Sequence, residues 1–341
     1  MWERLRRFGR QPTPEGQRRP SRRRLSAAAG ALILVLFALA LSWYWSREPE
    51  VFWVTADTQE RPVVLGYSTT DTLIRVASWL LDKPGGYLSN DIAPPGLWLD
   101  NMPNFEFGVV VQVRDLARVL RNDYSRSQTQ STEDPDLAVA EPAFNFDNDS
   151  WILPSTESQY ADGIEALRSF RTRLTDTNAA DAQFYARADN LREWLAVVAT
   201  RLGSLSQRLS ASVGQVRVNT DLAGEPAADL STVRPENIGV KTPWLEIDDV
   251  FYEARGNAWA LVHFMRAAQF DFADVLEDKN AVVSLRQIIR ELEGGLSPMR
   301  SPIILNGSGF GLFANHSLVL ASYLSRANAA VIDLRSLLEQ G

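Results

Sequence analysis

Cysteine is absent from this 341-residue chain, and histidine occurs only at His263 and His316. The lack of cysteine excludes disulfide bonds, thiolate metal sites and cysteine nucleophiles. Two histidines are also too few for a multi-histidine metal site. We therefore expect no metal and no cofactor, and we expect the fold to be held by packing alone.

Charge is divided unevenly along the chain. The whole chain carries a formal charge of −7, but residues 1–24 contain nine Arg and two Glu and so carry +7. Residues 25–45 are uncharged, which leaves −14 on residues 46–341. A surface with this excess of carboxylates repels phosphate, so we expect no nucleic-acid binding by the main body of the chain.

The uncharged segment 25–45 is long enough to cross a membrane. As a helix its 21 residues would span about 31 Å, against a hydrocarbon core of about 30 Å. Trp43, Tyr44 and Trp45 close its far end, where aromatic rings prefer the headgroup layer. The Arg excess before it predicts that residues 1–24 are a basic cytoplasmic tail, held to the anionic lipids of the inner membrane. Residues 46–341 would then form a periplasmic helical domain.

A cleaved export signal is the alternative to a permanent membrane helix. Residues 21–25 partly match a twin-arginine signal, and residues 38–40 fit a small-x-small cleavage pattern that would leave Leu41 at the mature N-terminus. The apolar run continues past Ala40 into the aromatic cluster, where a signal would turn polar, so we favour an uncleaved anchor. Both interpretations place residues 46–341 outside the cytoplasm.

Helical periodicity dominates the rest of the chain. Residues 51–54 could be extended, after which apolar spacing predicts helices over 68–83, 105–124, 156–174, 181–212, 243–275, 280–293 and 311–338. Thr156 with Gln159 matches a capping box, and Thr242 before Pro243 matches an N-cap. Heptad seams run from Phe184 to Leu209, from Phe251 to Val275 and from Phe313 to Leu337. These patterns predict an all-α fold: an N-terminal transmembrane helix followed by a seven-helix bundle with long ordered loops over 84–104, 125–154 and 214–242.

The first candidate for chemistry is an acidic turn that contains Glu246, Asp248, Asp249 and Glu253. Asp249 and Glu253 lie four residues apart and so share a helix face, as paired carboxylates for acid–base work would. Acidic residues near a helix N-terminus also complement the helix dipole. We favour this structural role, and keep Asp249 and Glu253 as catalytic candidates.

The second candidate is the glycine-rich stretch 306–311, which precedes the last predicted helix. Its backbone N–H groups could bind an anion, although it matches neither a dinucleotide-binding nor a P-loop fingerprint. The ligand-binding candidates are Asn306, Gly307, Gly309 and Asn315. His316 follows as a catalytic candidate, but a lone histidine on an apolar seam is more often a hydrogen-bonded core residue. The same interpretation applies to His263.

Arg supplies 32 of the 35 basic residues. Arg side chains in the body could bind carboxylates or phosphates bidentately. Those singled out are Arg114, Arg118, Arg121, Arg126, Arg201 and Arg208. A high-GC codon bias accounts for the same excess without a function, and we favour that explanation.

Several strings together resemble the domain-of-unknown-function family 2333. They are LLDKPGGYLSND (80–91), WLDNMPN (98–104), SRSQ (125–128), PWLEIDDVFYE (243–253) and ILNGSGFG (304–311). The resemblance covers nearly the whole chain from the membrane segment onward. It implies a Gram-negative bacterial envelope protein with one N-terminal membrane segment, and it carries over no functional residues.

Two hypotheses of function follow. The first is a non-enzymatic, single-pass inner-membrane protein whose periplasmic bundle serves as a scaffold or adaptor, by binding another envelope protein or a second copy of itself. The second is a periplasmic domain that binds or hydrolyses an envelope component, and it requires Asp249, Glu253 and His316 to converge on one cleft.

Overall fold

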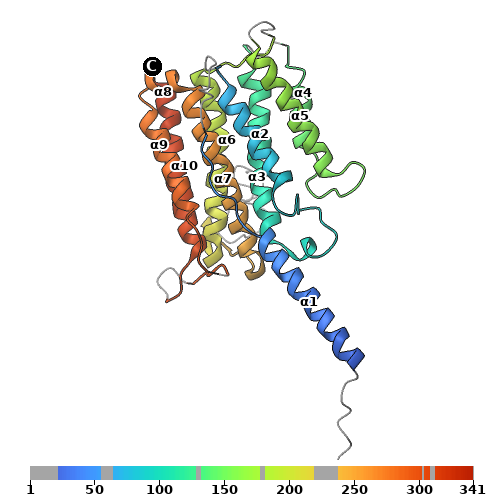
Figure 1. Cartoon of the computed structure of the whole chain (residues 1–341). Helices are drawn as coiled ribbons and strands as arrows, with labels where there is room; N and C mark the ends of the chain where they lie inside the picture. The colour runs from blue at the N-terminus through green and yellow to red at the C-terminus, as the bar shows by residue number, and fades with distance from the viewer. Residues whose placement is uncertain are drawn as a thin grey trace, which may run out of the picture. The chain divides into compact units, whose positions relative to one another are not determined.

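The computed structural model describes residues 22–54, 64–127, 132–176, 181–218, 237–301, 303–307 and 312–340. Ten α-helices and two short strands occur in these ranges (Figure 1). The chain divides into two compact units, Met1–Leu41 and Ser42–Gly341. The all-α prediction is confirmed.

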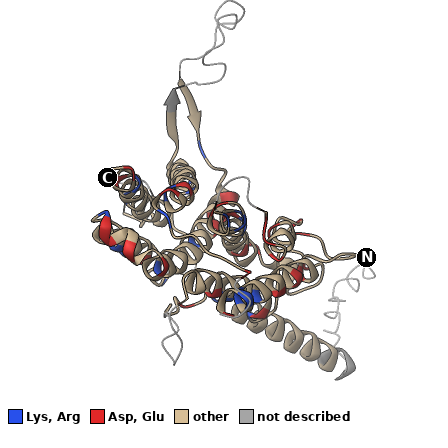
Figure 2. Ribbon diagram, turned by 90° about the horizontal axis from the view of Figure 1, so that it is seen from above, with Lys and Arg blue, Asp and Glu red and all other residues tan. Residues whose placement is uncertain are grey.

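Helix α1 (Arg22–Trp45) contains the predicted apolar segment. From Ser26 to Trp45 it is long and apolar enough to cross a membrane, a property that signal sequences share. Its large apolar side chains, including Leu34 and Phe37, are exposed. Figure 2 shows it without Lys, Arg, Asp or Glu along most of its length.

The second unit is a bundle of helices that run alongside one another (Figure 1). Its helices are α2 (Tyr67–Asp82), α3 (Asn101–Val119), α4 (Leu137–Phe144), α5 (Thr156–Thr175), α6 (Ala188–Ser210), α7 (Ile247–Asp271), α8 (Ala273–Asp278), α9 (Val282–Gly295) and α10 (His316–Glu339). Between α6 and α7, β1 (Gln215–Val218) and β2 (Asn237–Val240) pair antiparallel and project from the bundle (Figure 2).

Helix α7 lies at the centre of the bundle. Every residue from Ala254 to Met265 is buried, because α2, α3, α9 and α10 pack around it. It approaches α3 most closely at two glycines. A Cβ on Gly256 would lie 1.9 Å from the carbonyl oxygen of Phe105, and one on Gly108 would lie 2.1 Å from that of Glu253. Only residues without a side chain allow this contact between the two backbones.

The first two heptad seams form the core as predicted. From α6, Leu191, Leu195, Val198, Leu202, Leu205 and Leu209 are buried, and from α7, Phe251, Ala254, Ala258, Leu261, Met265 and Ala268 are buried. The third seam is only partly correct. Leu320, Ala327 and Leu334 are buried, but α10 begins at His316, so Phe313 precedes the helix and is exposed.

Several local predictions are wrong. The predicted loop 125–154 contains α4, the predicted loop 214–242 contains β1 and β2, and residues 181–187 are not helical, although Phe184 is buried. The N-cap of α5 is Ser155, whose Oγ accepts from the Ser158 N–H at 3.3 Å. Thr242 and Pro243 lie before a short 3-10 turn, and α7 itself begins at Ile247. The described bundle therefore contains two helices, α4 and α8, that the seven-helix prediction lacked.

Candidate functional site

The most elaborate polar arrangement in the bundle joins residues 46–54, here named the strap, to one face of α7 (Figure 1). The Glu48 carboxylate bonds Arg255, the Glu50 carbonyl oxygen accepts from Trp259 Nε1 at 3.2 Å, and the Phe52 N–H donates to His263 Nε2 at 3.0 Å. Two extended residues rise about 6.6 Å and four helical residues about 6.0 Å. The two segments therefore advance by nearly the same distance, so that strap residues two positions apart contact α7 residues four positions apart.

Arg255 anchors the start of the strap. Its side chain is 5% exposed, and its Nε donates to both oxygens of Glu48 at 2.8 and 2.9 Å. The rest of the guanidinium donates to the carbonyl oxygens at the C-terminus of α9, at 3.0 Å for Gly295 and 3.3 Å for Leu296 and Ser297. A cation is favourable at a helix C-terminus. One buried side chain thus ties the strap, α7 and α9 together.

His263 fixes the middle of the strap. It is fully buried, its ring stacks on Phe52 with centroids 3.7 Å apart, and its Nδ1 lies 2.6 Å from the carbonyl oxygen of Trp259. Because Nε2 accepts the Phe52 N–H, Nδ1 carries the proton and the ring is neutral. Burial, aided by the charges of Arg266 and Arg75, lowers the pKa of His263 to about 3. The hydrogen-bonded core role predicted for His263 is what the structure shows.

Two arginines hold the end of the strap. Arg266 NH1 donates to the Phe52 carbonyl oxygen at 2.7 Å, and Arg75 donates to the Trp53 carbonyl oxygen at 3.3 Å. The Arg75 guanidinium also lies 3.9 Å from the Phe52 ring centre, a cation–π contact. The strap is therefore fastened at every second residue from Glu48 to Phe52.

Two cavities adjoin Arg255. The larger, about 700 Å³, is lined by Trp43 and by polar and apolar side chains of the strap, α3, α7 and the segment after α9, including Glu48 and Arg255. The smaller, about 340 Å³, shares Arg255, Pro298 and Met299 with the first and adds His316 and Tyr323. Both volumes suit a small molecule. Arg255, which lines both cavities, is already paired with Glu48.

The acidic turn is used for packing between helices. Asp249 accepts from Asn104 Nδ2 of α3 at 2.7 Å, and burial raises the pKa of Asp249. Glu253 forms a bidentate pair with Arg208 of α6, with both contacts at 2.6 Å. Both candidates thus bind partners on neighbouring helices.

The glycine-rich loop is held by its own polar side chains. Asn315 caps α10 by accepting from the Leu318 N–H at 2.8 Å, and its Nδ2 donates to the Gly307 carbonyl oxygen at 2.5 Å. Asn306 pairs with Asn315 in an isolated antiparallel bridge. His316 Nδ1 accepts from the Leu305 N–H at 2.9 Å, and burial lowers the pKa of His316. Gly309 lies outside the described residues.

The structure does not bring the catalytic candidates together. The His316 ring lies beside Phe251, with ring centres 6.4 Å apart, and both line the smaller cavity. Residues two positions apart on a helix point about 200° apart. Asp249 and Glu253 therefore face away from the side of α7 that His316 contacts, and neither lines the two cavities beside Arg255.

Most of the singled-out arginines pair within the chain. Arg201 bonds Asp115 at 2.7 Å, Arg208 bonds Glu253, and Arg121 pairs with Glu133 and Glu141. Arg114 donates to the carbonyl oxygens of Phe144 and Phe146, both at 2.7 Å. These contacts are structural and leave the side chains engaged rather than open to a ligand.

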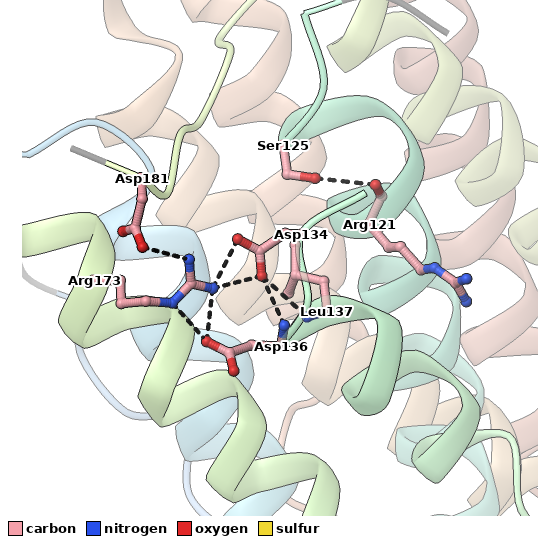
Figure 3. A network of polar contacts seen from close by, with 7 residues as sticks. All are labelled: Arg121, Ser125, Asp134, Asp136, Leu137, Arg173 and Asp181. Carbon is pink, nitrogen blue, oxygen red and sulfur yellow. Dashed lines mark hydrogen bonds and ion pairs between the residues drawn. The ribbon is translucent and has the colours of Figure 1, made fainter. Parts of the chain in front are cut away.

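A further arginine, Arg173 of α5, organises a network of three aspartates (Figure 3). It bonds Asp134 and Asp136, each with a closest contact of 2.7 Å, and pairs with Asp181 at 3.6 Å. Asp134 also accepts from the backbone N–H groups of Asp136 and Leu137, which begin α4. The network therefore positions α4 against α5.

A buried ion pair that the sequence did not predict joins Lys83, in one of the strings that carry the family resemblance, to Glu106 of α3. Lys83 Nζ lies 2.7 Å from Glu106 Oε1, and the two side chains are 2% and 0% exposed. Glu106 also accepts from the N–H groups of Leu88 and Ser89, both at 2.9 Å. Burial raises the pKa of Glu106, which Lys83 opposes. The pair shapes the loop after α2, and the string DKPGGYLS was the available signal.

Comparison with known proteins gives one family. No curated protein and no solved structure matches the chain. The family described as "Uncharacterized protein conserved in bacteria (DUF2333)" matches residues 21–341. Because this match covers well over half of the sequence, the chain belongs to the DUF2333 family of bacterial proteins.

Proposed function

We propose that this protein is a single-pass inner-membrane protein whose helical domain, residues 46–341, lies in the periplasm and acts as a scaffold or adaptor in the cell envelope. Residues 1–24 would be its cytoplasmic tail and residues 25–45 its membrane span. The apolar helix α1 and membership of a bacterial family support this location. The +7 charge of residues 1–24 supports the direction of insertion.

The observation that carries the proposal is the strap. It begins directly after α1 and is fastened to Arg255, Trp259 and His263 along the central helix. A flexible linker would let an exported domain move freely from its anchor. In this chain the ion pair of Glu48 with the buried Arg255, the buried ring of His263 and two further arginines instead hold the first residues after the apolar helix in place.

The candidate residues for chemistry support a structural role over a hydrolytic one. Asp249 and Glu253 bond Asn104 and Arg208, and Asn315 caps α10. A hydrolase would require an acid, a base and a substrate cleft at one place. Asp249 and Glu253 point from one side of α7 and His316 contacts another side, so we favour the scaffold.

The scaffold proposal predicts a defined partner. Chemical crosslinking in intact cells, followed by capture of the tagged full chain, should yield one stoichiometric adduct with an envelope protein or with a second copy. A chain tagged in the same way but carrying Glu48→Ala and Phe52→Ala, which release the strap, should give less of that adduct at equal abundance. Recovery of the uncrosslinked chain alone under gentle conditions would contradict the proposal.

A further inference from the structure

One end of the bundle gathers exposed aromatic side chains on four separate segments. Trp98 follows α2, Trp151 follows α4, Trp244 precedes α7, and Phe313 precedes α10. Each of these rings has an exposed aliphatic neighbour in the sequence: Leu97, Ile152, Leu245 and Leu312 respectively. All eight side chains are more than half exposed. We name these four aromatic–aliphatic neighbours the tip pairs.

Contacts between the segments place the tip pairs at the same end. Asn90, in the loop of Trp98, donates to the Ser150 carbonyl oxygen beside Trp151. Asn104, at the start of α3, bonds Asp249 at the start of α7, just after Trp244. The loop between α9 and α10 meets α7 through Arg255 and through the Phe251–His316 ring contact. The other end of the bundle, as far as it is described, exposes Trp53, Leu65, Val139, Phe270 and Val283, but none of these is next in sequence to another exposed large apolar residue.

Chain connectivity brings this end close to the end of α1. Trp45, the last residue of α1, packs on the loop after α2, since a Cβ on Gly85 would come within 2.7 Å of its ring. Glu48, already fastened to Arg255, is three residues further, a distance of at most about 11 Å. Trp43 and Tyr44 are also exposed here. If α1 crosses the bilayer, this end of the bundle lies at headgroup depth.

We infer that the tip pairs insert into the surface of the bilayer that α1 crosses, so that the domain rests on the membrane in one orientation. This inference rests on the proposed membrane anchorage. Tryptophan prefers the membrane–water interface, and interfacial apolar groups enter about 5–10 Å below the surface. Aromatic rings on four segments around one end form a broad contact that a single membrane helix cannot supply.

The charges beside the tip pairs specify the kind of lipid. Among the described residues, the exposed carboxylates near them, Asp100, Asp147, Asp149 and Glu246, outnumber the exposed cations at the same end, which are Arg47, Lys241 and Arg300. These carboxylates oppose an anionic surface, so the contact depends on apolar insertion between zwitterionic headgroups. Added anionic lipid should weaken it, in contrast to the attraction expected for the basic tail.

Cysteine scanning tests the inference directly, because the chain has no cysteine to remove. Leu245→Cys and Val283→Cys are matched variants, since the two residues are 77% and 75% exposed and lie at opposite ends of the bundle. Each full-length variant is labelled with an environment-sensitive fluorophore and reconstituted into phosphatidylcholine vesicles that contain brominated lipid. We expect strong quenching and a blue shift at position 245 and neither change at 283. Leu312→Cys places an independent second probe at the same end of the bundle as Leu245.

The controls separate this inference from membrane anchorage. A probe at Ala31→Cys, within α1, should be quenched in every preparation. If the probe at position 31 is quenched but the probe at position 245 is as unquenched as the one at 283, the inference about the tip pairs is overturned and the anchorage stands. If the probe at position 31 is not quenched, the anchorage itself is overturned. A third outcome is that the probe at position 245 is not quenched in vesicles, but the cysteine at 245 is protected from labelling in native membranes. That result would assign this end of the bundle to a protein partner and overturn the lipid contact.

Discussion

Acidification should destabilise the bundle through His263. The ring is buried and neutral, with a pKa of about 3, while an unfolded histidine has a pKa of about 6.5. A histidine whose pKa is lower in the folded state favours folding most above pH 6.5, and this stability is lost as the pH falls toward 3. Between pH 7 and pH 5 the loss is about 2 kcal/mol, because the unfolded state takes up a proton that the folded state cannot.

The structure gives the physical reason for that loss. Protonation would place a hydrogen on Nε2, which already accepts the Phe52 N–H at 3.0 Å, and Arg75 and Arg266 lie nearby. Buried carboxyl groups with raised pKa values, such as Glu106 and Asp271, act in the opposite direction. The native protein and the His263→Gln variant both contain these carboxyl groups, so their contribution cancels in the difference between the two unfolding free energies.

The assay is urea unfolding of the full chain in lipid nanodiscs, followed by far-ultraviolet circular dichroism at pH 7 and pH 5. The His263→Gln variant should be less stable than the native protein at pH 7, with the difference shrinking by about 2 kcal/mol at pH 5. The matched variant His316→Gln should retain most of the native pH dependence. An equal difference between the native protein and His263→Gln at both pH values would refute the reasoning.

Three further predictions concern stability, each measured by the same unfolding experiment at pH 7. Gly256→Ala should cost about 1–3 kcal/mol, because its Cβ would meet the Phe105 backbone at 1.9 Å, and an unchanged midpoint would contradict the close approach of α3 and α7. Glu106→Gln should cost about 3–5 kcal/mol by leaving Lys83 buried without its partner. Adding Lys83→Met to the Glu106→Gln variant should recover much of that loss, because it removes the unpaired cation while the glutamine oxygen can still accept from the N–H groups of Leu88 and Ser89. A double variant less stable than Glu106→Gln alone would contradict this explanation. Leu202→Asp should unfold the bundle, since the site is fully buried, and retained helical dichroism would show otherwise.

Periodicity predicted the core because its cause is local. The seams of α6 and α7 repeat every three or four residues, and the same residues, such as Leu195 and Ala258, line the interior. Where the signal depends on distant contacts, the prediction failed. Helix α4 has only eight residues with Pro142 inside, and its first turn is held by Asp134 and by Arg173 of α5. No window of sequence around α4 contains that arginine.

The same limit applies to the site. The acidic turn was recognisable, but Asn104 and Arg208, which determine its structural use, come from α3 and α6. The strap had a weak local signal in the apolar residues from Val51 to Val54. Its docking depends on contacts with α7 more than 200 positions away in the sequence, such as the bond between Phe52 and His263. Spacing within one segment cannot reveal such a partner.

The orientation of the chain across the membrane is the central claim, and cysteine labelling in intact cells tests it most directly. Val283→Cys should react with a membrane-impermeant maleimide that reaches the periplasm, while Gln17→Cys should react only after the inner membrane is permeabilised. Both positions should be found on a full-length chain. Protection of position 283 until permeabilisation, or loss of residues 1–24 from the mature protein, would contradict the account.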